Sequence, residues 1–285
     1  MKEKVCLVTG ANRGLGKAAA AALAQQGAKV VLACRDEQRG ETARAEVASA
    51  AENSMVDLLL VDLSKMESIR RFVTAFNEKY PRLDVLINCA AIYKAEREMT
   101  ADHLETMFAT NHLGPFLLTN LLLEKLKTSA PARVLVVTAP STTPLDFDDL
   151  QGEQRFRPLQ AFGVTKMCNL LFTYALARRL AGTGVTVNAV FPGLLKSKLM
   201  SEAPFALRWL TQLASIPAGK AAAGLVYLAS SSEVAGVSGK FFKDGKEIRS
   251  NQYSYERKVQ DQLWERSAAL AFPTEMAPSG QPAAA

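Results

Sequence analysis

The chain has 285 residues, of which 48% are hydrophobic and 22% charged, a composition typical of a globular protein with an ample core. Its net charge of +6 is dispersed along the chain, which gives no indication of a nucleic-acid-binding surface. No uncharged apolar stretch has the length of a membrane span, and because the first strand begins at about residue 4 we expect no signal peptide.

Strand-like and helical patterns alternate along the chain. The expected strands are 5–8, 30–33, 58–61, 84–88, 134–137, 185–190 and 239–242. One helix is expected after residue 14, and the others are expected over 36–52, 64–79, 101–127, 160–181 and 219–230. Ser64 is the expected N-cap of the helix over 64–79, and the region 101–127 is interrupted near Gly114-Pro115. Continuous apolar strands separated by helices predict an α/β fold, a single-domain Rossmann-type doubly wound parallel sheet of about seven strands with helices on both faces. This domain is expected over residues 1–272, followed by a disordered tail over 273–285.

The four cysteines are widely spaced and lie in apolar contexts, at Cys6, Cys34, Cys89 and Cys168. No C-x-x-C pair or Cys/His cluster accompanies them, so neither a metal site nor a disulfide framework is expected. Reduced core cysteines predict a cytoplasmic protein.

A glycine-rich turn follows the first strand, where the chain reads Thr-Gly-Ala-Asn-Arg-Gly-Leu-Gly. Glycines let backbone N–H groups approach a pyrophosphate, and the N-terminus of the next helix favours its negative charge. The turn therefore predicts a dinucleotide site formed by Thr9, Gly10, Asn12, Arg13, Gly14, Leu15 and Gly16. Such a turn can also be a plain strand-to-helix connection, and its spacing is not the Gly-x-Gly-x-x-Gly of most dinucleotide dehydrogenases.

The pattern Thr9-Gly10-x-x-x-Gly14-x-Gly16 resembles the cofactor turn of the short-chain dehydrogenase/reductase family. The segments 147–151, 169–173, 182–188, 236–240 and 263–265 resemble its retinol dehydrogenase and WW-domain-oxidoreductase branch. The resemblance covers about residues 4–270 and implies a nicotinamide cofactor and a small apolar carbonyl or alcohol substrate. Relatives often pair through two long central helices, but about twenty residues between Ser141 and Phe162 could cover that surface, so an oligomer is left open.

Basic residues near the glycine turn bear on the choice of cofactor. NAD enzymes place an acid after the second strand, whereas an arginine accommodates the 2′-phosphate of NADP. Arg35 holds that position and Arg13 lies in the turn, so NADP(H) is expected in preference to NAD(H). The alternatives are that both arginines are solvated, or that Asp36 binds the ribose.

The resemblance implies further cofactor contacts after later strands. Asp62 and Leu63 would flank the adenine, and Asn88-Cys89-Ala90-Ala91 partly matches the family's Asn-Asn-Ala-Gly. The remaining cofactor contacts implied are Asn88, Ala90, Lys166, Pro192, Gly193, Leu195 and Ser197. Residues 199–215 read as an apolar helix that suits either a substrate lid or a packed surface helix.

The family's reacting groups are a Tyr-x-x-x-Lys pair, a serine after the fifth strand and an asparagine in a central helix. Lys166 and Asn111 match this pattern, whereas Phe162 stands at the tyrosine position and Ala139 at the serine position. Thr138 or Ser141 could replace the serine only if the loop shifts. Phenylalanine has no proton to give, and loss of a general acid costs about 10²–10⁴ in rate.

Two hypotheses follow. The first is an NADP(H)-dependent oxidoreductase whose proton comes from water, His112, Tyr93 or a substrate group; an engineered Tyr-to-Phe variant of an active enzyme also fits. The second is a catalytically inactive NADP(H)-binding protein that acts as a sensor or scaffold. Non-redox chemistry such as elimination or isomerisation is a third alternative.

Overall fold

The structure is a computed structural model and describes residues 1–194, 199, 202 and 215–273. Within these residues an eight-stranded sheet has the order β3-β2-β1-β4-β5-β6-β7-β8. Its strands are β1 (Val5–Thr9), β2 (Lys29–Cys34), β3 (Val56–Leu60), β4 (Val85–Asn88), β5 (Ala132–Val137), β6 (Val185–Phe191), β7 (Phe241–Lys243) and β8 (Lys246–Ile248). All neighbouring strands pair in parallel except β7 and β8. The predicted doubly wound parallel sheet is confirmed.

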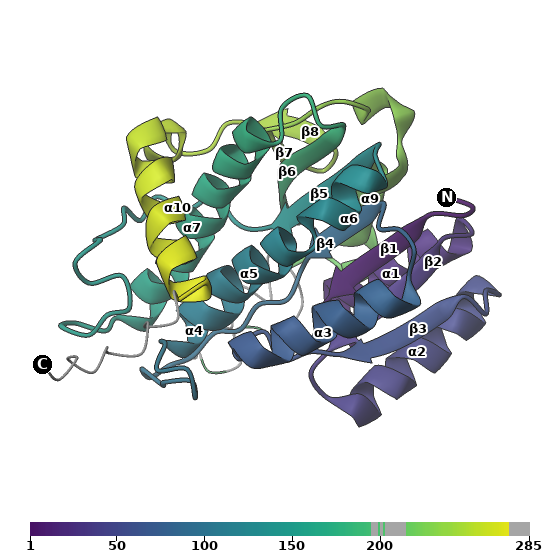
Figure 1. Ribbon diagram of the computed structural model, residues 1–285, viewed down its shortest axis with the longest axis horizontal. Helices are drawn as coiled ribbons and strands as arrows, with labels where there is room; N and C mark the ends of the chain where they lie inside the picture. Colours follow the sequence, from purple (N-terminus) through teal and green to yellow (C-terminus); the bar gives the residue numbers. More distant parts are fainter. Residues whose placement is uncertain (195–198, 200–201, 203–214, 274–285) are drawn as a thin grey trace, which may run out of the picture.

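Helices cover both faces of the sheet (Figure 1). They are α1 (Gly14–Gln25), α2 (Glu37–Ala51), α3 (Met66–Lys79), α4 (Thr106–Phe108), α5 (Gly114–Leu121), α6 (Leu123–Thr128), α7 (Pro158–Arg179), α9 (Ala218–Ser230) and α10 (Arg257–Ala271), with one π-helical turn η1 (Ala109–Leu113) and 3₁₀ turns η2 (Ser232–Val234) and η3 (Gln252–Tyr255). One apolar core lies under α1, α2 and α9, and a second lies under α3, α5 and α7. None of the helices in the described part of the chain has the length and apolar character needed to cross a membrane.

The eighth strand was not predicted because it is short and polar. β8 pairs antiparallel with β7 around Asp244-Gly245, where both residues have positive φ, 51° and 75°. An Asp-Gly pair with positive φ at both positions favours a two-residue hairpin. That dipeptide is the signal that could have revealed the strand.

Two predicted helix starts are wrong. Ser64 does not cap α3, because its side chain donates to Asp62 and the helix begins at Met66 with Lys65 in the N-cap position. The helical region expected from residue 101 begins only at Thr106, where the carboxylate of Glu105 accepts from the N–H groups of Met107 (2.8 Å) and Phe108 (2.6 Å).

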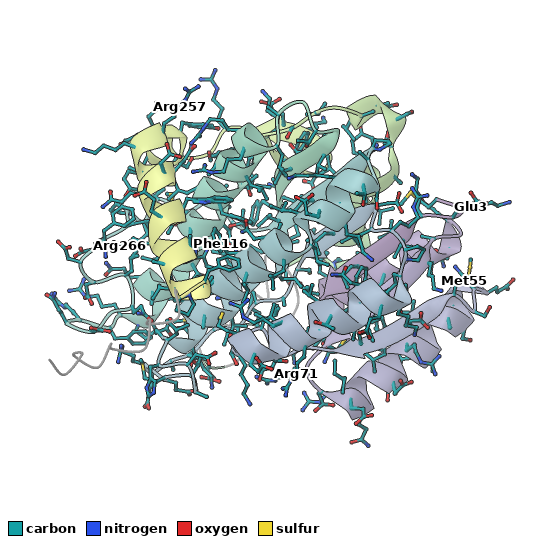
Figure 2. All side chains as sticks on the ribbon, in the orientation of Figure 1. Glu3, Met55, Arg71, Phe116, Arg257 and Arg266 are labelled. Atoms are coloured by element: carbon teal, nitrogen blue, oxygen red, sulfur yellow. The ribbon has the colours of Figure 1, made fainter. Side chains whose placement is uncertain are left out.

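The C-terminal helix α10 was also not predicted, and it covers α5 and α7 from outside. Phe116 lies beneath it (Figure 2). The Phe116 and Trp264 ring centroids are 5.0 Å apart, and those of Phe172 and Trp264 are 6.0 Å apart. This aromatic contact holds α10 on the layer that carries the site residues of α7. The tail expected after Phe272 falls almost wholly outside the described residues.

Candidate active site and cofactor site

The glycine turn after β1 permits close approach of backbone segments. Gly10 has a φ of 66°, and a Cβ there would lie 2.8 Å from the Cα of Ala90. A Cβ on Gly16 would lie 2.6 Å from the carbonyl oxygen of Gly10. Both contacts are with backbone atoms that cannot move aside, so only glycine fits. Gly14, with a φ of 54°, has nothing of the described structure within 4 Å of such a Cβ, so the turn faces open space there.

The ends of β1 and β4 are tied together at the point where the strand order reverses. The Thr9 Oγ1 accepts from the N–H groups of Cys89 (2.9 Å) and Ala90 (3.1 Å). The Asn88 Nδ2 donates to the Thr119 Oγ1 at 2.9 Å. Thr9 and Asn88 therefore shape this edge of the sheet through their protein contacts, and this edge is where doubly wound folds bind ligands.

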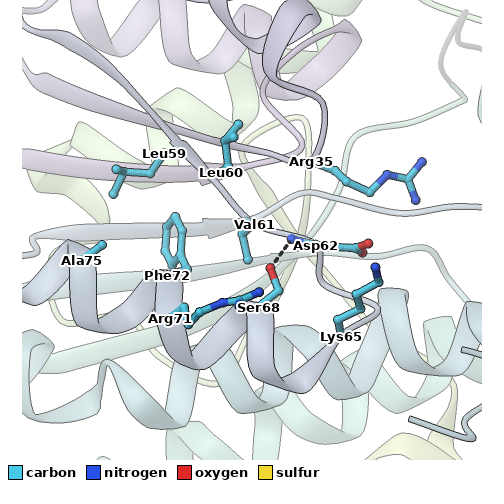
Figure 3. Close-up of a pocket in the computed structure, with 10 residues that line it drawn as sticks. All are labelled: Arg35, Leu59, Leu60, Val61, Asp62, Lys65, Ser68, Arg71, Phe72 and Ala75. Atoms are coloured by element: carbon cyan, nitrogen blue, oxygen red, sulfur yellow. Dashed lines mark hydrogen bonds between the residues drawn. The ribbon is translucent and has the colours of Figure 1, made fainter. Parts of the chain in front are cut away.

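A hollow of about 580 Å³ lies beside the carboxyl ends of β2 and β3 (Figure 3). It is lined by Arg35, Leu59, Leu60, Val61, Asp62, Lys65, Ser68, Arg71, Phe72 and Ala75. Figure 3 shows Arg35, Asp62 and Lys65 at one end and the apolar residues Leu59, Phe72 and Ala75 at the other. The hollow thus joins a polar end to an apolar end. Sequence reasoning included Arg35 and Asp62 but missed Lys65, whose position at a helix start is visible only once the start is known.

The acidic residue beside Arg35 is already engaged by its own helix. The Asp36 Oδ1 accepts from the N–H of Arg39 at 2.8 Å, which makes Asp36 the N-cap of α2. Its other carboxylate oxygen lies 3.4 Å from the Arg39 guanidinium. Arg13, by contrast, occupies the N-cap position of α1 without a capping bond from its side chain.

Helix α7 carries Phe162 and Lys166 one turn apart. The Lys166 Nζ lies over the Phe162 ring, 4.9 Å from its centroid. Lys166 is only 6% exposed, and this burial lowers its pKa from 10.5 to about 8. No hydrogen bond or ion pair of its ammonium is found among the described residues, so its N–H donors are unused there.

The hydroxyls that follow β5 are engaged by the backbone of α7. The Thr138 Oγ1 donates to the carbonyl of Lys166 at 2.8 Å, and the Ser141 Oγ donates to the carbonyl of Gly163 at 2.8 Å. Both residues therefore hold the loop against α7. Ala139 lies between them, half-buried and without a hydroxyl. The idea that Thr138 or Ser141 supplies a free hydroxyl is not favoured by these bonds.

Asn111 and His112 point to different parts of the molecule although they are adjacent in η1. The Asn111 side chain bonds both backbone groups of Ile92, at 2.8 and 2.9 Å, and so joins η1 to the loop after β4. The His112 Nε2 instead lies 2.8 Å from the Ser267 Oγ on α10. Burial lowers the His112 pKa to about 4. His112 is therefore a neutral, structural residue, and the expectation that it could supply the reaction's proton is wrong.

Tyr93 also contacts the Phe162 ring. Their ring centroids are 5.8 Å apart in an edge-to-face arrangement. Tyr93 and Met107 form the buried centre of a small apolar cluster, against which Ile92, Phe156, Ala161, Phe162 and Leu199 pack. Burial, with the charge of Glu202, raises the Tyr93 pKa.

The loop after β6 completes this edge of the sheet as far as it is described. Pro192 is buried and Gly193 has a φ of 82°. Leu195 and Ser197, expected to contact the cofactor, lie outside the described residues, as does most of the helix expected over 199–215.

Comparison with known proteins then decides the family. The model of the short chain dehydrogenase family matches residues 4–205. Human retinol dehydrogenase 14 is 40% identical over 291 residues, which cover 95% of this chain and 87% of the human protein. Mouse retinol dehydrogenase 12 is 40% identical over 272 residues, covering 94% of this chain and 86% of its own. The chain belongs to the short-chain dehydrogenase/reductase family. It is thus an oxidoreductase of the family that binds a nicotinamide cofactor.

Solved structures share the fold over most of the chain. An uncharacterized protein from Mycobacterium paratuberculosis matches with a TM-score of 0.73 and 29% identity, covering 95% of this chain and 94% of its own. A variant of actinorhodin polyketide ketoreductase, solved with NADPH, matches with a TM-score of 0.69 and 24% identity, covering 85% of this chain and 97% of its own. The second comparison supports the fold alone.

The described residues fit a dinucleotide of this family. The open space beside Gly14 admits a phosphate to the N-terminus of α1, where the helix dipole favours negative charge. The buried Lys166 ammonium has unused donors that suit ribose hydroxyls. A bound nicotinamide cofactor would supply or accept the hydride, and these residues would hold and orient it.

Proposed function

We propose that this short-chain dehydrogenase/reductase is an NADP(H)-dependent oxidoreductase that interconverts an apolar alcohol and its carbonyl compound in the cytoplasm. The proposal includes a weakened proton transfer, and it assigns Phe162 and Ala139 to the places of the family's tyrosine and serine. The observation that carries the proposal is Lys166, a residue only 6% exposed whose ammonium has no hydrogen-bond or ion-pair partner among the described residues, on a chain that keeps the glycine turn. A buried charge without a partner is unfavourable, which supports a role in binding an absent ligand.

The surroundings of Phe162 support an apolar substrate. Tyr93, Met107, Ile92 and Phe156 form an apolar cluster with Phe162. The retinol dehydrogenases at 40% identity are named for an apolar alcohol, and this supports the same class of substrate here. An apolar cluster favours such a body by burial of its surface.

Arg13 and Arg35 support NADP(H) over NAD(H), as does the engagement of Asp36 in capping α2. Charge-assisted contacts with a phosphate contribute about 1.5–3 kcal/mol each, so NADPH is expected to bind at least about tenfold tighter than NADH. Titration of the protein with each nucleotide, followed by nucleotide fluorescence, measures the ratio. Equal affinities would contradict the preference and leave Asp36 as the ribose ligand.

The reaction is tested by single-turnover oxidation of protein-bound NADPH against a panel of aldehydes and ketones. Slow but substrate-dependent oxidation is expected, fastest with apolar compounds. A rate equal to that of free NADPH for every compound, with normal cofactor binding, would contradict the enzymatic proposal.

A second candidate is an inactive NADP(H)-binding protein. The observation that favours it is the engagement of Thr138 and Ser141 by carbonyls of α7, which leaves no free hydroxyl next to Ala139. This candidate predicts tight NADPH binding and no oxidation by any member of the panel. The same experiment therefore separates the two candidates.

A further inference from the structure

We propose that Lys65 is a third phosphate-binding cation of this protein, which holds the 2′-phosphate of NADP(H) together with Arg35 at the polar end of the hollow. This inference rests on the proposed NADP(H) preference and adds a residue that the glycine turn and the second strand do not supply. Lys65 comes from the start of α3, after the third strand.

The first observation is the position of Lys65 in the hollow. Arg35 and Lys65 line the same cavity and stand at the same end of it, with Asp62 between them (Figure 3). Arg35 comes from the end of β2 and Lys65 from the loop after β3, so a phosphate entering between the two strand ends would meet cations from two elements. Such a pair suits a phosphate dianion, which accepts several charge-assisted hydrogen bonds.

The second observation is that the ammonium of Lys65 has no ion-pair or hydrogen-bond partner in the part of the chain that the structure describes. No carboxylate of the described residues lies within 4.0 Å of it, whereas Arg71 on the same wall lies 3.9 Å from Glu67. The nearby carboxylate of Asp62 is turned toward Ser64, whose N–H and hydroxyl donate to Oδ1 at 3.0 and 2.6 Å. Asp62 is thus held within its own turn.

The third observation is a local departure from helix-capping rules. Lys65 is the N-cap residue of α3, with φ −128° and ψ 113°, and its side chain makes no capping bond. Serine, threonine, aspartate and asparagine are favoured at this position, and a cation is disfavoured by the helix dipole. Such departures are expected where function requires the residue. Arg13 shows the same departure at the start of α1, at the proposed phosphate-binding turn.

The three observations lead to a trade-off that can be measured. Lys65→Ser removes the cation and supplies a favoured N-cap, so the cofactor-free variant is expected to melt at a higher temperature than the parent. The same variant is expected to bind NADPH about tenfold more weakly, while NADH binding stays the same because NADH has no 2′-phosphate. Lys65→Arg keeps the charge and is expected to retain NADPH affinity.

The experiment measures dissociation constants for NADPH, NADH and 2′,5′-ADP by titration, and melting temperatures without nucleotide. Lys258→Ser is the matched control, since Lys258 is an exposed lysine in the first turn of α10. It removes the same charge at another helix start and should leave all three affinities unchanged. Arg35→Ser tests the proposed preference for NADPH over NADH without changing Lys65.

The outcomes separate the two proposals. One outcome is that the parent prefers NADPH, that Arg35→Ser loses this preference and that Lys65→Ser keeps it. In that case the assignment of Lys65 is overturned, and the proposed preference for NADPH stands. If Lys65→Ser weakens NADH as much as NADPH, its effect is general and the assignment is overturned as well. If the parent binds both nucleotides equally, the preference itself fails, and the role of Lys65 fails with it.

Discussion

Replacing Lys166 by methionine is expected to stabilise the cofactor-free protein and to weaken its binding of NADPH. Burial lowers the Lys166 pKa from 10.5 to about 8. One pKa unit corresponds to about 1.4 kcal/mol, so burying the ammonium costs about 3 kcal/mol at neutral pH. The contact of its Nζ with the Phe162 ring offsets about 1 kcal/mol of this cost. Methionine keeps an apolar stem in the same space, so the expected net gain is about 2 kcal/mol.

The pH dependence gives a second, independent signature of Lys166. Between about pH 8 and 10.5 the unfolded chain binds this proton and the folded chain does not, so this group makes the parent more stable as pH rises. Below pH 8 both states are protonated and the full cost remains. The advantage of Lys166→Met is therefore largest at pH 7 and is nearly gone at pH 10.

Urea unfolding without nucleotide, at pH 7 and pH 10, measures both effects. Lys258→Met, at an exposed lysine of α10, is the control and should change neither curve. Equal stability of parent and Lys166→Met at pH 7 would refute the reasoning, because the ammonium would then be solvated or paired. An unchanged NADPH affinity would remove Lys166 from the proposed ribose contact.

Two further predictions concern the reacting groups and the neighbouring histidine. The double variant Phe162→Tyr with Ala139→Ser is expected to reduce an apolar aldehyde with NADPH at least about tenfold faster than the parent, and faster than either single variant. The reason is that the proton-donating phenol and the serine hydroxyl return together. A parent that is already as fast as the double variant would show that another group donates the proton. His112, with its pKa lowered to about 4 by burial, is expected to make the protein less stable as pH falls from 6.5 to about 4, because only the unfolded chain takes up the proton there. Melting temperatures of the parent and His112→Asn across this window test it, and parallel curves would mean that the imidazole is protonated in the folded state.

The sequence alone was sufficient to predict a doubly wound parallel sheet. Buried parallel strands are continuous apolar runs, such as the one that became β6 (Val185–Phe191), and they need no distant partner to be recognised. The glycine turn was equally legible, because the need for close backbone approach is a property of glycine itself. Weakly apolar elements such as β8 were missed because their stability comes from pairing with β7.

Side-chain direction was decided only by tertiary packing. Asn111 and His112 are neighbours in the chain, yet one joins the loop after β4 and the other bonds Ser267, 155 residues later. Their separation depends on the π-helical turn and on the packing of α10 against η1, α5 and α7, which no local sequence pattern specifies. Sequence position therefore left His112 open as an acid, and packing excluded it.

The same holds for the capping residues at the edge of the sheet. Ser64 and Lys65 are adjacent, and local propensity favours the serine as N-cap. In the folded protein the serine donates to Asp62, so the helix begins one residue later and the lysine takes the N-cap position at the hollow. Propensity is a sum of small local preferences, whereas the start of α3 is decided by the Ser64–Asp62 bond and by Asp102, whose carboxylate accepts from the N–H of Met66 at 2.8 Å from 36 residues away.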